Sequence, residues 1–586
     1  MTDFGAKVPF QNKKARMLML KRCLLVALAL LILMGTFAGC STGPALNPAD
    51  YITVAENGST DYVLVNCGVE AVELAKFSAL LNKRMGVQLK IVNKAPETGK
   101  GIFVGDADKI EELFGFSAVE SYAHYSIRVD ESGNMYIYAA MKEALTEAIS
   151  AASELFVEVK KGMFGFQKNI HLTAGVSGVE EPVPMFDSKS AVMVNELYKC
   201  ANGDTQIRYN QVGNQADVLA YVAELEQAGF TYYTGNKDVG NNLFATYVKG
   251  NTLVHINYFA KYRQLNILFG VKGHLLSNQP IELTAEQKVV VPSITQMYLS
   301  NTGLSMVLQL ADGSFYIIDG GRYDPATDGE IQETINAGAA NEKEYAFEQD
   351  TAGDVEKLWA FIQANTPSGQ RPQITWMITH ADTDHIDAPV QFIKAYAGQF
   401  DLTQVCYNFP NDGAGVAFVE TVKNLYPDAG HYVMHTGDTF HLPGNAELEI
   451  LCAVEDLEEL KWDNWNLTSA AWRFTVEGKT ILITGDTETA PNNKMYQTFG
   501  KYLKSDVYQV PHHGANGGVL TMNKAVDPSV CFWAVSKEKF ENDNRMGGTS
   551  NAKYDHTQWL RKSSNVKAHY HQSETVTLEL PTLARR

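Results

Sequence analysis

The chain of 586 residues lacks the cysteine patterns of a disulfide scaffold and of a thiolate metal site. Its 7 cysteines are an odd number at irregular spacing, and no Cys-x-x-Cys pair occurs. Disulfide frameworks normally use an even number of cysteines, and structural zinc clusters use closely spaced thiols. Neither class of protein is expected here.

Positive charge is also scarce. The sequence has 49 Lys and Arg residues against 67 Asp and Glu residues, which gives a formal net charge of −18 at pH 7. A field of this sign repels polyphosphates at long range. The charge balance therefore argues against bulk nucleic acid as a partner. The remaining composition, 45% hydrophobic and 20% charged, is typical of a soluble globular protein.

The apolar run near the N-terminus, from Cys23 to Met34, is too short for a permanent membrane span. It has about a dozen residues, whereas a membrane-spanning helix needs roughly 20. Basic residues precede the run and small residues follow it, which is the pattern of a secretory signal. The motif Phe37-Ala38-Gly39-Cys40-Ser41 resembles the lipobox of bacterial lipoproteins, in which the cysteine is acylated and becomes the mature N-terminus.

We therefore interpret residues 1–40 as a lipoprotein signal peptide with Cys40 as the lipidation site, and residues 41–50 as a tether. The alternative is an uncleaved membrane anchor. Both interpretations predict an extracytoplasmic protein that is attached to the bacterial cell membrane by its N-terminal end.

The length predicts several domains, because a single core does not grow to this size. Residues 51–178 read as a small α/β domain of alternating strands and helices. The order of elements and the turn Ile102-Phe-Val-Gly-Asp-Ala-Asp108 resemble the non-catalytic domain that precedes the barrel in hexosaminidases and α-glucuronidases. Residues 186–286 read as an α+β accessory domain without catalytic spacing, a packing or recognition module.

The densest cluster of metal-binding side chains lies in Ile374–Pro389. A predicted strand from Ile374 to Ile378 leads into His380, Asp382, Asp384 and His385, and a helical pattern follows. Extended spacing predicts that the first three side chains project the same way and that His385 points to the other side. Such a loop can serve two metal ions. The alternative is helix capping by Asp382 or Asp384, which explains one carboxylate and neither histidine.

Three further polar motifs each follow a predicted strand. Asp319 ends a hairpin that is signalled by the Asp312-Gly313 turn, and Gly485-Asp486 follows the strand Thr480–Thr484. Pro511-His512-His513-Gly514 follows the strand Asp506–Val510.

In order and spacing, these motifs resemble those of the metallo-β-lactamase superfamily. The usual signature is HxHxDH, whereas this chain has HxDxDH. The variant resembles the branch that contains the nuclease domain of bacterial DNA-uptake channels and the phosphocholine esterases of cell-surface proteins. The resemblance implies an α/β fold in which residues 290–586 form an αββα sandwich.

The resemblance also implies a two-metal centre. In this assignment Asp384 and His385 hold one ion with His512, His380 and Asp382 hold the other, and Asp486 bridges both. Sequence alone leaves the choice between His512 and His513 open, and we favour His512 because it directly follows the strand end and Pro511.

Two further residues, Asp319 and Asn466, bear on the predicted metal centre. The resemblance implies a buried structural role for Asp319 beneath the site. It also places Asn466 where common members have a histidine. Because an amide oxygen is a poorer zinc ligand than imidazole, the centre is expected to be oxygen-rich and to take two divalent ions, Zn or Mn.

Ions in such a site lower the pKa of a shared water from about 16 toward roughly 7, so that hydroxide forms at neutral pH. Asp384, as a ligand, is counted among the catalytic residues. Protonation of the leaving group needs a further residue, and His513 and His556 are the candidates. The alternative for His556 is an ordinary surface histidine near a helix start.

Three functions follow from these assignments. The first is a surface-anchored metal-dependent hydrolase, a phosphodiesterase that acts on a phosphodiester or a cell-envelope glycan. The second is a lactonase or β-lactamase-type hydrolase, against which the replaced histidines argue. The third is a non-catalytic glycan-binding protein with a vestigial metal site, which Asn466 and the accessory domains favour.

Overall fold

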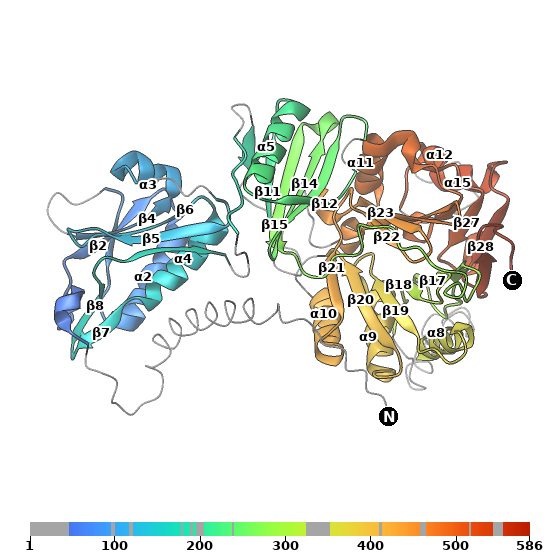
Figure 1. Ribbon diagram of the computed structural model, residues 1–586, viewed down its shortest axis with the longest axis horizontal. Helices are drawn as coiled ribbons and strands as arrows, with labels where there is room; N and C mark the ends of the chain where they lie inside the picture. Colours follow the sequence, from blue (N-terminus) through green and yellow to red (C-terminus); the bar gives the residue numbers. More distant parts are fainter. Residues whose placement is uncertain are drawn as a thin grey trace, which may run out of the picture. The chain divides into compact units, whose positions relative to one another are not determined.

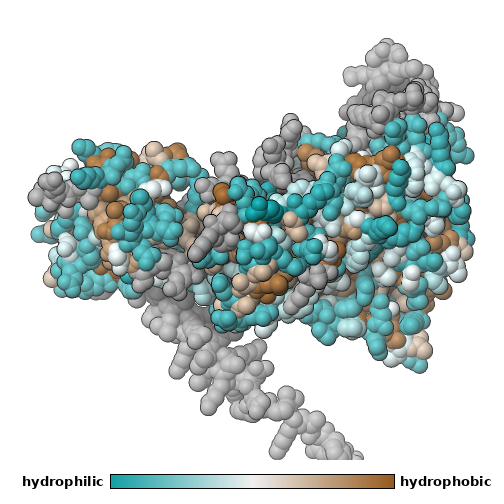
Figure 2. All heavy atoms as spheres, turned by 90° about the horizontal axis from the view of Figure 1, so that it is seen from above, coloured by the Kyte–Doolittle hydropathy of each residue, from teal (hydrophilic) through white to brown (hydrophobic). Residues whose placement is uncertain are grey.

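The computed structural model describes the chain from residue 46 onward with several gaps. The described residues are 46–94, 100–116, 121–176, 179, 181–187, 191–194, 204–236, 239–323, 352–409, 413–456, 464–514, 517–542 and 555–586. The predicted signal peptide and Cys40 lie outside them, so lipidation stays a prediction. Within these ranges, no helix combines the length and the apolar character that crossing a membrane requires. On the face in Figure 2, hydrophilic residues predominate and hydrophobic residues gather in small groups.

The described residues form two compact units, of which the first takes in parts of Met1–Leu113, Ser126–Tyr138 and Ala148–Leu172. Most of the predicted domain 51–178 lies in this first unit. The second unit contains both the predicted domain 186–286 and the predicted domain 290–586. The domain boundaries themselves stay predictions.

The N-terminal sheets have an α/β pattern. A six-stranded sheet has the order β3 (Lys90–Val92), β2 (Tyr62–Cys67), β4 (Lys100–Asp106), β6 (Met135–Ala139), β5 (His124–Val129), β9 (His171–Gly175). A three-stranded sheet has the order β1 (Tyr51–Glu56), β8 (Met163–Gln167), β7 (Val157–Lys160). The helices are η1 (Pro48–Asp50), α2 (Ala71–Met85), α3 (Ala107–Phe114) and α4 (Lys142–Glu154). Helix α2 ends at Gly86, whose φ of 71° is the left-handed conformation that glycine adopts at low cost.

A second six-stranded sheet, the middle sheet, precedes the C-terminal half. Its order is β10 (Val192–Val194), β11 (Thr205–Asn210), β15 (Gln264–Val271), β14 (Thr252–Phe259), β13 (Leu243–Lys249), β12 (Thr231–Thr234), and α5 (Gln215–Gln227) and η2 (Ala260–Tyr262) accompany it. Every residue of β14 is buried, so both faces of this strand are covered.

The C-terminal half contains two seven-stranded sheets. One has the order β21 (Gly430–Val433), β20 (Asp401–Tyr407), β19 (Gln373–Met377), β18 (Phe315–Asp319), β17 (Ser305–Gln309), β16 (Ser293–Gln296), β29 (Val576–Glu579). The other has the order β22 (Thr439–Leu442), β23 (Ala446–Cys452), β24 (Ala471–Val476), β25 (Lys479–Ile483), β26 (Val507–Gln509), β27 (Val530–Trp533), β28 (Ala568–His571).

The helices of this half are distributed over the outer faces of both sheets (Figure 1). They are α8 (Ala352–Asn365), α9 (Thr383–Ala395), α10 (Gly413–Leu425), α11 (Thr489–Phe499), α12 (Leu520–Val526), α13 (Lys537–Asn542) and α15 (Asp555–Lys562). Short 3₁₀ turns are η3 (Val454–Asp456), η4 (Trp465–Thr468), η5 (Gly500–Leu503) and η6 (Pro511–Gly514).

Three hydrophobic cores establish the layers. The central core joins the sheets, with Ile318 and Met377 from one and Trp472 and Ile483 from the other. A second core packs α8, α9 and α10 on the first sheet, and a third packs α11, α12 and α15 on the second sheet. The order is therefore helix, sheet, sheet, helix, and the predicted α/β class with an αββα sandwich is confirmed.

The middle sheet is joined to this sandwich by buried polar contacts. The side chains of Gln206, Arg208 and Asn266 all donate to the carbonyl oxygen of Glu455, at 3.0, 2.6 and 3.1 Å. The buried Lys494 of α11 donates to Gln264 Oε1 at 2.6 Å. Buried polar groups need such partners, so the sheet and the η3 turn specify each other's position. The sequence suggested a packing or recognition module here but did not indicate these contacts.

Candidate metal centre

Asp319 organises the strand ends on which the site is built. It is fully buried and has a φ of 52°, a left-handed conformation that is uncommon outside glycine. Its Oδ1 accepts from the Thr379 backbone N–H at 2.7 Å, and its Oδ2 accepts from the Thr379 hydroxyl at 2.6 Å and from His385 Nδ1 at 2.7 Å. The expected buried, hydrogen-bonded position of Asp319 is what the structure has. Because His385 donates from Nδ1, its Nε2 lone pair is available for a cation.

Asp384 and His385 lie in the first turn of α9, which begins at Thr383. His385 Nε2 is 3.8 Å from Asp384 Oδ1 and 3.3 Å from Asp486 Oδ2. The extended spacing that we predicted for this segment is wrong, because the backbone is already helical here. Consecutive residues therefore reach the same group of donors, and His385 does not point away from it.

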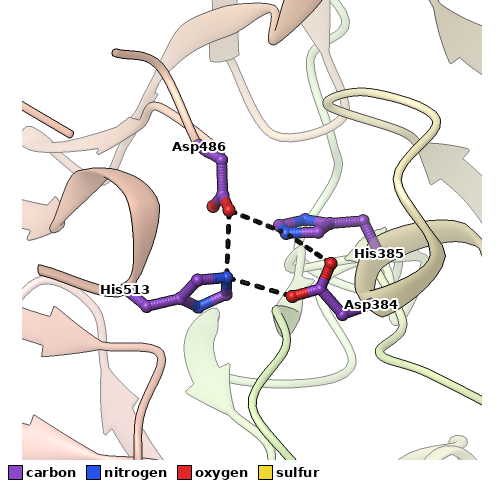
Figure 3. A group of neighbouring side chains, drawn as sticks. All are labelled: Asp384, His385, Asp486 and His513. Atoms are coloured by element: carbon purple, nitrogen blue, oxygen red, sulfur yellow. Dashed lines mark ion pairs between the residues drawn. The ribbon is translucent and has the colours of Figure 1, made fainter. Parts of the chain in front are cut away.

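Asp486 and His513 come from the other sheet. Asp486 follows β25 and Gly485, where an added Cβ would lie 2.6 Å from the Thr379 Cβ, so the two sheets meet closely at this point. His513 donates from Nδ1 to the Ala534 carbonyl at 2.8 Å. Its Nε2 lies 2.9 Å from Asp486 Oδ2 and 3.1 Å from Asp384 Oδ2. Figure 3 shows the four side chains converging, with these contacts as dashed lines.

These four residues, which we call the four-donor group, fit a divalent cation. One ligand atom from each of Asp384, His385, Asp486 and His513 lies within 4.8 Å of all the others. The Nε2 atoms of both histidines and Oδ1 of Asp486 are buried and have no hydrogen-bond partner among the described residues. Two imidazole nitrogens and two carboxylates form a donor set that Zn²⁺ or Mn²⁺ accepts.

The electrostatics of the group are those of a cation site. Burial alone would lower the pKa of His513, but the carboxylates of Asp486 and Asp384 outweigh burial and raise it to about 10. The same carboxylates, with Asp319, raise the pKa of His385 against the opposing effect of burial. In return, the two histidines hold the pKa values of Asp384 and Asp486 below the usual range despite burial. A metal ion entering the group would displace protons from both imidazoles.

His380 and Asn466 form a pair beside the four-donor group. His380 is fully buried, its ring centroid is 4.2 Å from that of His385, and its Nε2 is 3.1 Å from Asn466 Oδ1. Asp382 is the N-cap of α9, and its Oδ1 accepts from the Thr383 N–H at 2.8 Å. The capping alternative therefore describes Asp382, and this residue is not in the four-donor group.

The structure places His513, and not His512, in the four-donor group. His512 Nε2 is 4.0 Å from Asp486 Oδ2, and its Nδ1 is 3.6 Å from Glu488 Oε1. His513 therefore has the position of a ligand, and its role as a proton donor stays a prediction. His556 lies on α15. Its ring is close to Gly518, where an added Cβ would be 3.1 Å away. Its role as a proton donor stays a prediction.

Several supporting residues escaped the sequence analysis. The Ser469 hydroxyl accepts from the Asp486 N–H at 3.2 Å. The Gln509 side chain accepts from the Thr484 N–H at 2.8 Å and donates to the Gly485 carbonyl at 3.1 Å, which joins the ends of β25 and β26. Two features of the sequence could have indicated these supporting residues. Gln509 is a polar residue in an apolar strand, and Thr379 directly precedes His380.

We expect Asp319→Asn to weaken metal binding by roughly 10- to 100-fold, the range typical for a lost partner of a ligating histidine. The single oxygen of the amide cannot accept both from the Thr379 backbone N–H and from His385 Nδ1, because these donors bond different oxygens of the carboxylate. One of these donors therefore faces the amide NH₂, and the orientation of His385 is disturbed. Competition with a chromophoric chelator measures the affinity. The matched control is Glu449→Gln, which alters a buried carboxylate bonded to Arg473 at 2.7 Å. Equal affinity losses in both variants would contradict the orienting role.

Comparison with known proteins gives only distant similarities. No protein-family model matches the chain, and no curated protein matches it in sequence. Among solved structures, CmlA, a diiron β-hydroxylase from Streptomyces venezuelae, is 12% identical over 53% of this chain and 55% of its own, with a TM-score of 0.28. Zn²⁺-bound PqqB from Methylobacterium extorquens is 11% identical over 49% and 100%, with a TM-score of 0.27.

A protein from Parabacteroides distasonis, named as a metal-dependent hydrolase, is 14% identical over 48% of this chain and 94% of its own, with a TM-score of 0.25. The chain spans about half the length of the CmlA structures that it matches, with 55% of each covered. TM-scores of this size transfer no residue role or activity to the present chain.

Proposed function

We propose that the chain is a metal-dependent hydrolase that cleaves phosphodiesters. The observation that carries the proposal is the convergence of four ligands, Asp384 and His385 from the start of α9 and Asp486 and His513 from the ends of β25 and β26. A divalent cation held there supplies Lewis acidity and lowers the pKa of a water. The residues of the chain supply orientation, since Asp319 and the Ala534 carbonyl fix the histidine rings with both Nε2 atoms toward the ion.

The positions of the hydrogen atoms around His380 support a second ion that is bound less tightly. The Thr379 hydroxyl donates to Asp319 Oδ2, so toward His380 Nδ1, 3.0 Å away, it accepts. Burial and the neighbouring His385 lower the pKa of His380 to about 4, so the ring is neutral and its only hydrogen is on Nδ1. Its Nε2 lone pair then faces the amide oxygen of Asn466. A divalent cation bound here would take the Nε2 lone pair and the amide oxygen as ligands.

In this assignment His380 and Asn466 would hold the second ion together with Asp486, whose Oδ1 is buried and has no hydrogen-bond partner among the described residues. One imidazole, one amide and one carboxylate bind less tightly than the four-donor group. We therefore propose a centre with unequal affinities, in which the second position prefers a hard ion such as Mn²⁺.

The substrate class follows from the donor set and from the resemblance to the HxDxDH branch. Two cations held by these residues would supply the charge neutralisation that an in-line displacement at phosphorus needs. The replaced histidines argue against a lactonase or β-lactamase. The acidic net charge argues for a small ester, such as a cell-envelope phosphodiester, over long DNA. The location at the outer side of the cell membrane stays a prediction from the sequence.

Metal content and a substrate panel test the proposal together. Purified protein dialysed against Zn²⁺ or Mn²⁺ is expected to hold one tight ion and one weaker ion. It is expected to hydrolyse bis-p-nitrophenyl phosphate faster than p-nitrophenyl phosphate, nitrocefin or a lactone. Preferred hydrolysis of nitrocefin would favour the lactamase-type alternative. Fewer than one ion per chain, with no turnover, would favour the glycan-binding alternative.

A further inference from the structure

The η4 turn, which carries Asn466, is held at both ends by the segment that follows β25. Asn464 and Ser469 are the N-cap and the C-cap of this turn. At the C-terminal end, the Ser469 hydroxyl accepts from the Asp486 N–H at 3.2 Å. At the N-terminal end, Asn464 Nδ2 donates to Glu488 Oε2 at 3.2 Å. The turn is therefore fixed to the strand end that supplies Asp486.

The side-chain amide of Asn464 connects Glu488 to the backbone of Asn466. Its Oδ1 accepts from the Asn466 N–H at 3.2 Å, while its Nδ2 donates to the Glu488 carboxylate. An ionised carboxylate only accepts hydrogen bonds, so it fixes the amide with its NH₂ toward Glu488 and its oxygen toward the turn. Hydrogen bonds to a charged acceptor are also stronger than neutral ones. Glu488 therefore sets the orientation in which Asn464 caps the η4 turn.

The carboxylate of Glu488 has a second neighbour on its other side. Its Oε1 is 3.6 Å from Nδ1 of His512, in the η6 turn, and the Glu488 side chain is partly buried. Glu488 is the N-cap residue of α11, but its side chain forms no capping hydrogen bond with the described N–H groups of that helix. The carboxylate is therefore directed toward the η4 and η6 turns beside the metal centre, and its removal leaves α11 without the loss of a cap.

We infer that Glu488 is a positioning residue for the second, weaker ion. Through Asn464 it holds Asn466, whose Oδ1 is 3.1 Å from His380 Nε2. The inference rests on the proposed function, in which His380 and Asn466 hold that ion, and adds the residue that sets the affinity of this position. The histidines of the four-donor group are oriented by other residues. Glu488 is therefore expected to act on one of the two ions.

The test titrates the metal-free full chain with Mn²⁺ by calorimetry. Glu488→Ala and Asn464→Ala are each expected to weaken the second ion about tenfold, the lower end of the range for a lost partner of a ligand. The tight ion is expected to bind as in the parent, which also shows that the variants fold. Because both residues act through one hydrogen bond, the double variant should lose about tenfold in total and not about a hundredfold. The matched control is Asn565→Ala, which removes an amide-to-carboxylate hydrogen bond of 2.6 Å to Asp527 and should leave both affinities unchanged.

Glu488→Gln separates the hydrogen bond from the charge. Glutamine keeps an oxygen that accepts from Asn464 but lacks the negative charge, so this variant is expected to bind the second ion like the parent. A loss as large as in Glu488→Ala would mean that charge sets the affinity and would overturn the inference. Equal losses of both ions in Glu488→Ala, or additive losses in the double variant, would overturn it too. A parent that binds a single Mn²⁺ would overturn the second ion of the proposed function and the inference with it, whereas two ions in the parent and unchanged affinities in Glu488→Ala would overturn the inference alone.

Discussion

Alanine at Asp384 or His385 is expected to abolish phosphodiester turnover, with a loss on the order of 10³-fold or more. Each replacement removes one of the four donors and leaves only three for a cation. Lewis-acid stabilisation is worth several kcal/mol, which corresponds to a loss of this size. Hydrolysis of bis-p-nitrophenyl phosphate measures turnover, and elemental analysis measures the bound ion. Added Zn²⁺ or Mn²⁺ is not expected to restore either.

Asp382 provides the matched control, because it belongs to the same motif but caps α9. Asp382→Ala removes the acceptor of the Thr383 N–H and is expected to cost about 1 kcal/mol of stability. The tight ion and most of the turnover are expected to remain. Turnover in Asp384→Ala equal to that of the parent would remove the catalytic assignment. A loss in Asp382→Ala as large as in Asp384→Ala would show that Asp382 is a ligand after all.

The fold of the C-terminal half was predictable because its signals are local and repeated. Val355, Leu358, Trp359 and Ile362 have the i, i+3, i+4, i+7 spacing of a helix with one apolar face, and all four side chains are buried in the core on α8. Motifs that each follow a strand predicted where the polar groups gather, since parallel strands such as β18 and β19 end at a common edge. The buried, hydrogen-bonded position of Asp319 was an expectation from the family resemblance, and the structure has it.

The choice of ligands could not be predicted from the sequence, because it depends on the backbone conformation of single residues. The backbone at Asp384 can be extended or helical, and the same sequence is compatible with both. This conformation decides which of two adjacent side chains faces the ion. The contacts of Arg208 and Asn266 with Glu455 were equally hidden. They join residues far apart in sequence, and polar side chains on a predicted strand read as solvent-exposed until the opposite surface is known.

The choice between the two consecutive histidines after β26 is the sharpest case. His512 and His513 both have left-handed backbone conformations, with φ of 46° and 54°. This conformation turns the chain within η6, so the first histidine is directed toward Glu488 and the second reaches Asp384 and Asp486. Two such residues in sequence are strained, and strain of this kind persists where the surrounding structure enforces it. Periodicity carries no information about it.

His513→Ala is therefore expected to lose the tight ion and the turnover, while His512→Ala keeps most of both. The two variants are well matched, because each places alanine at a left-handed position next to the same glycine-rich turn and bears the same backbone strain. The loss of affinity in His513→Ala should exceed the roughly 10- to 100-fold that removal of an outer partner costs. Titration of the metal-free variants with Zn²⁺, followed by calorimetry, compares them directly. The reverse ranking would mean that the η6 turn has the opposite histidine facing Asp486, and Ala534 would then have no part in orienting a ligand.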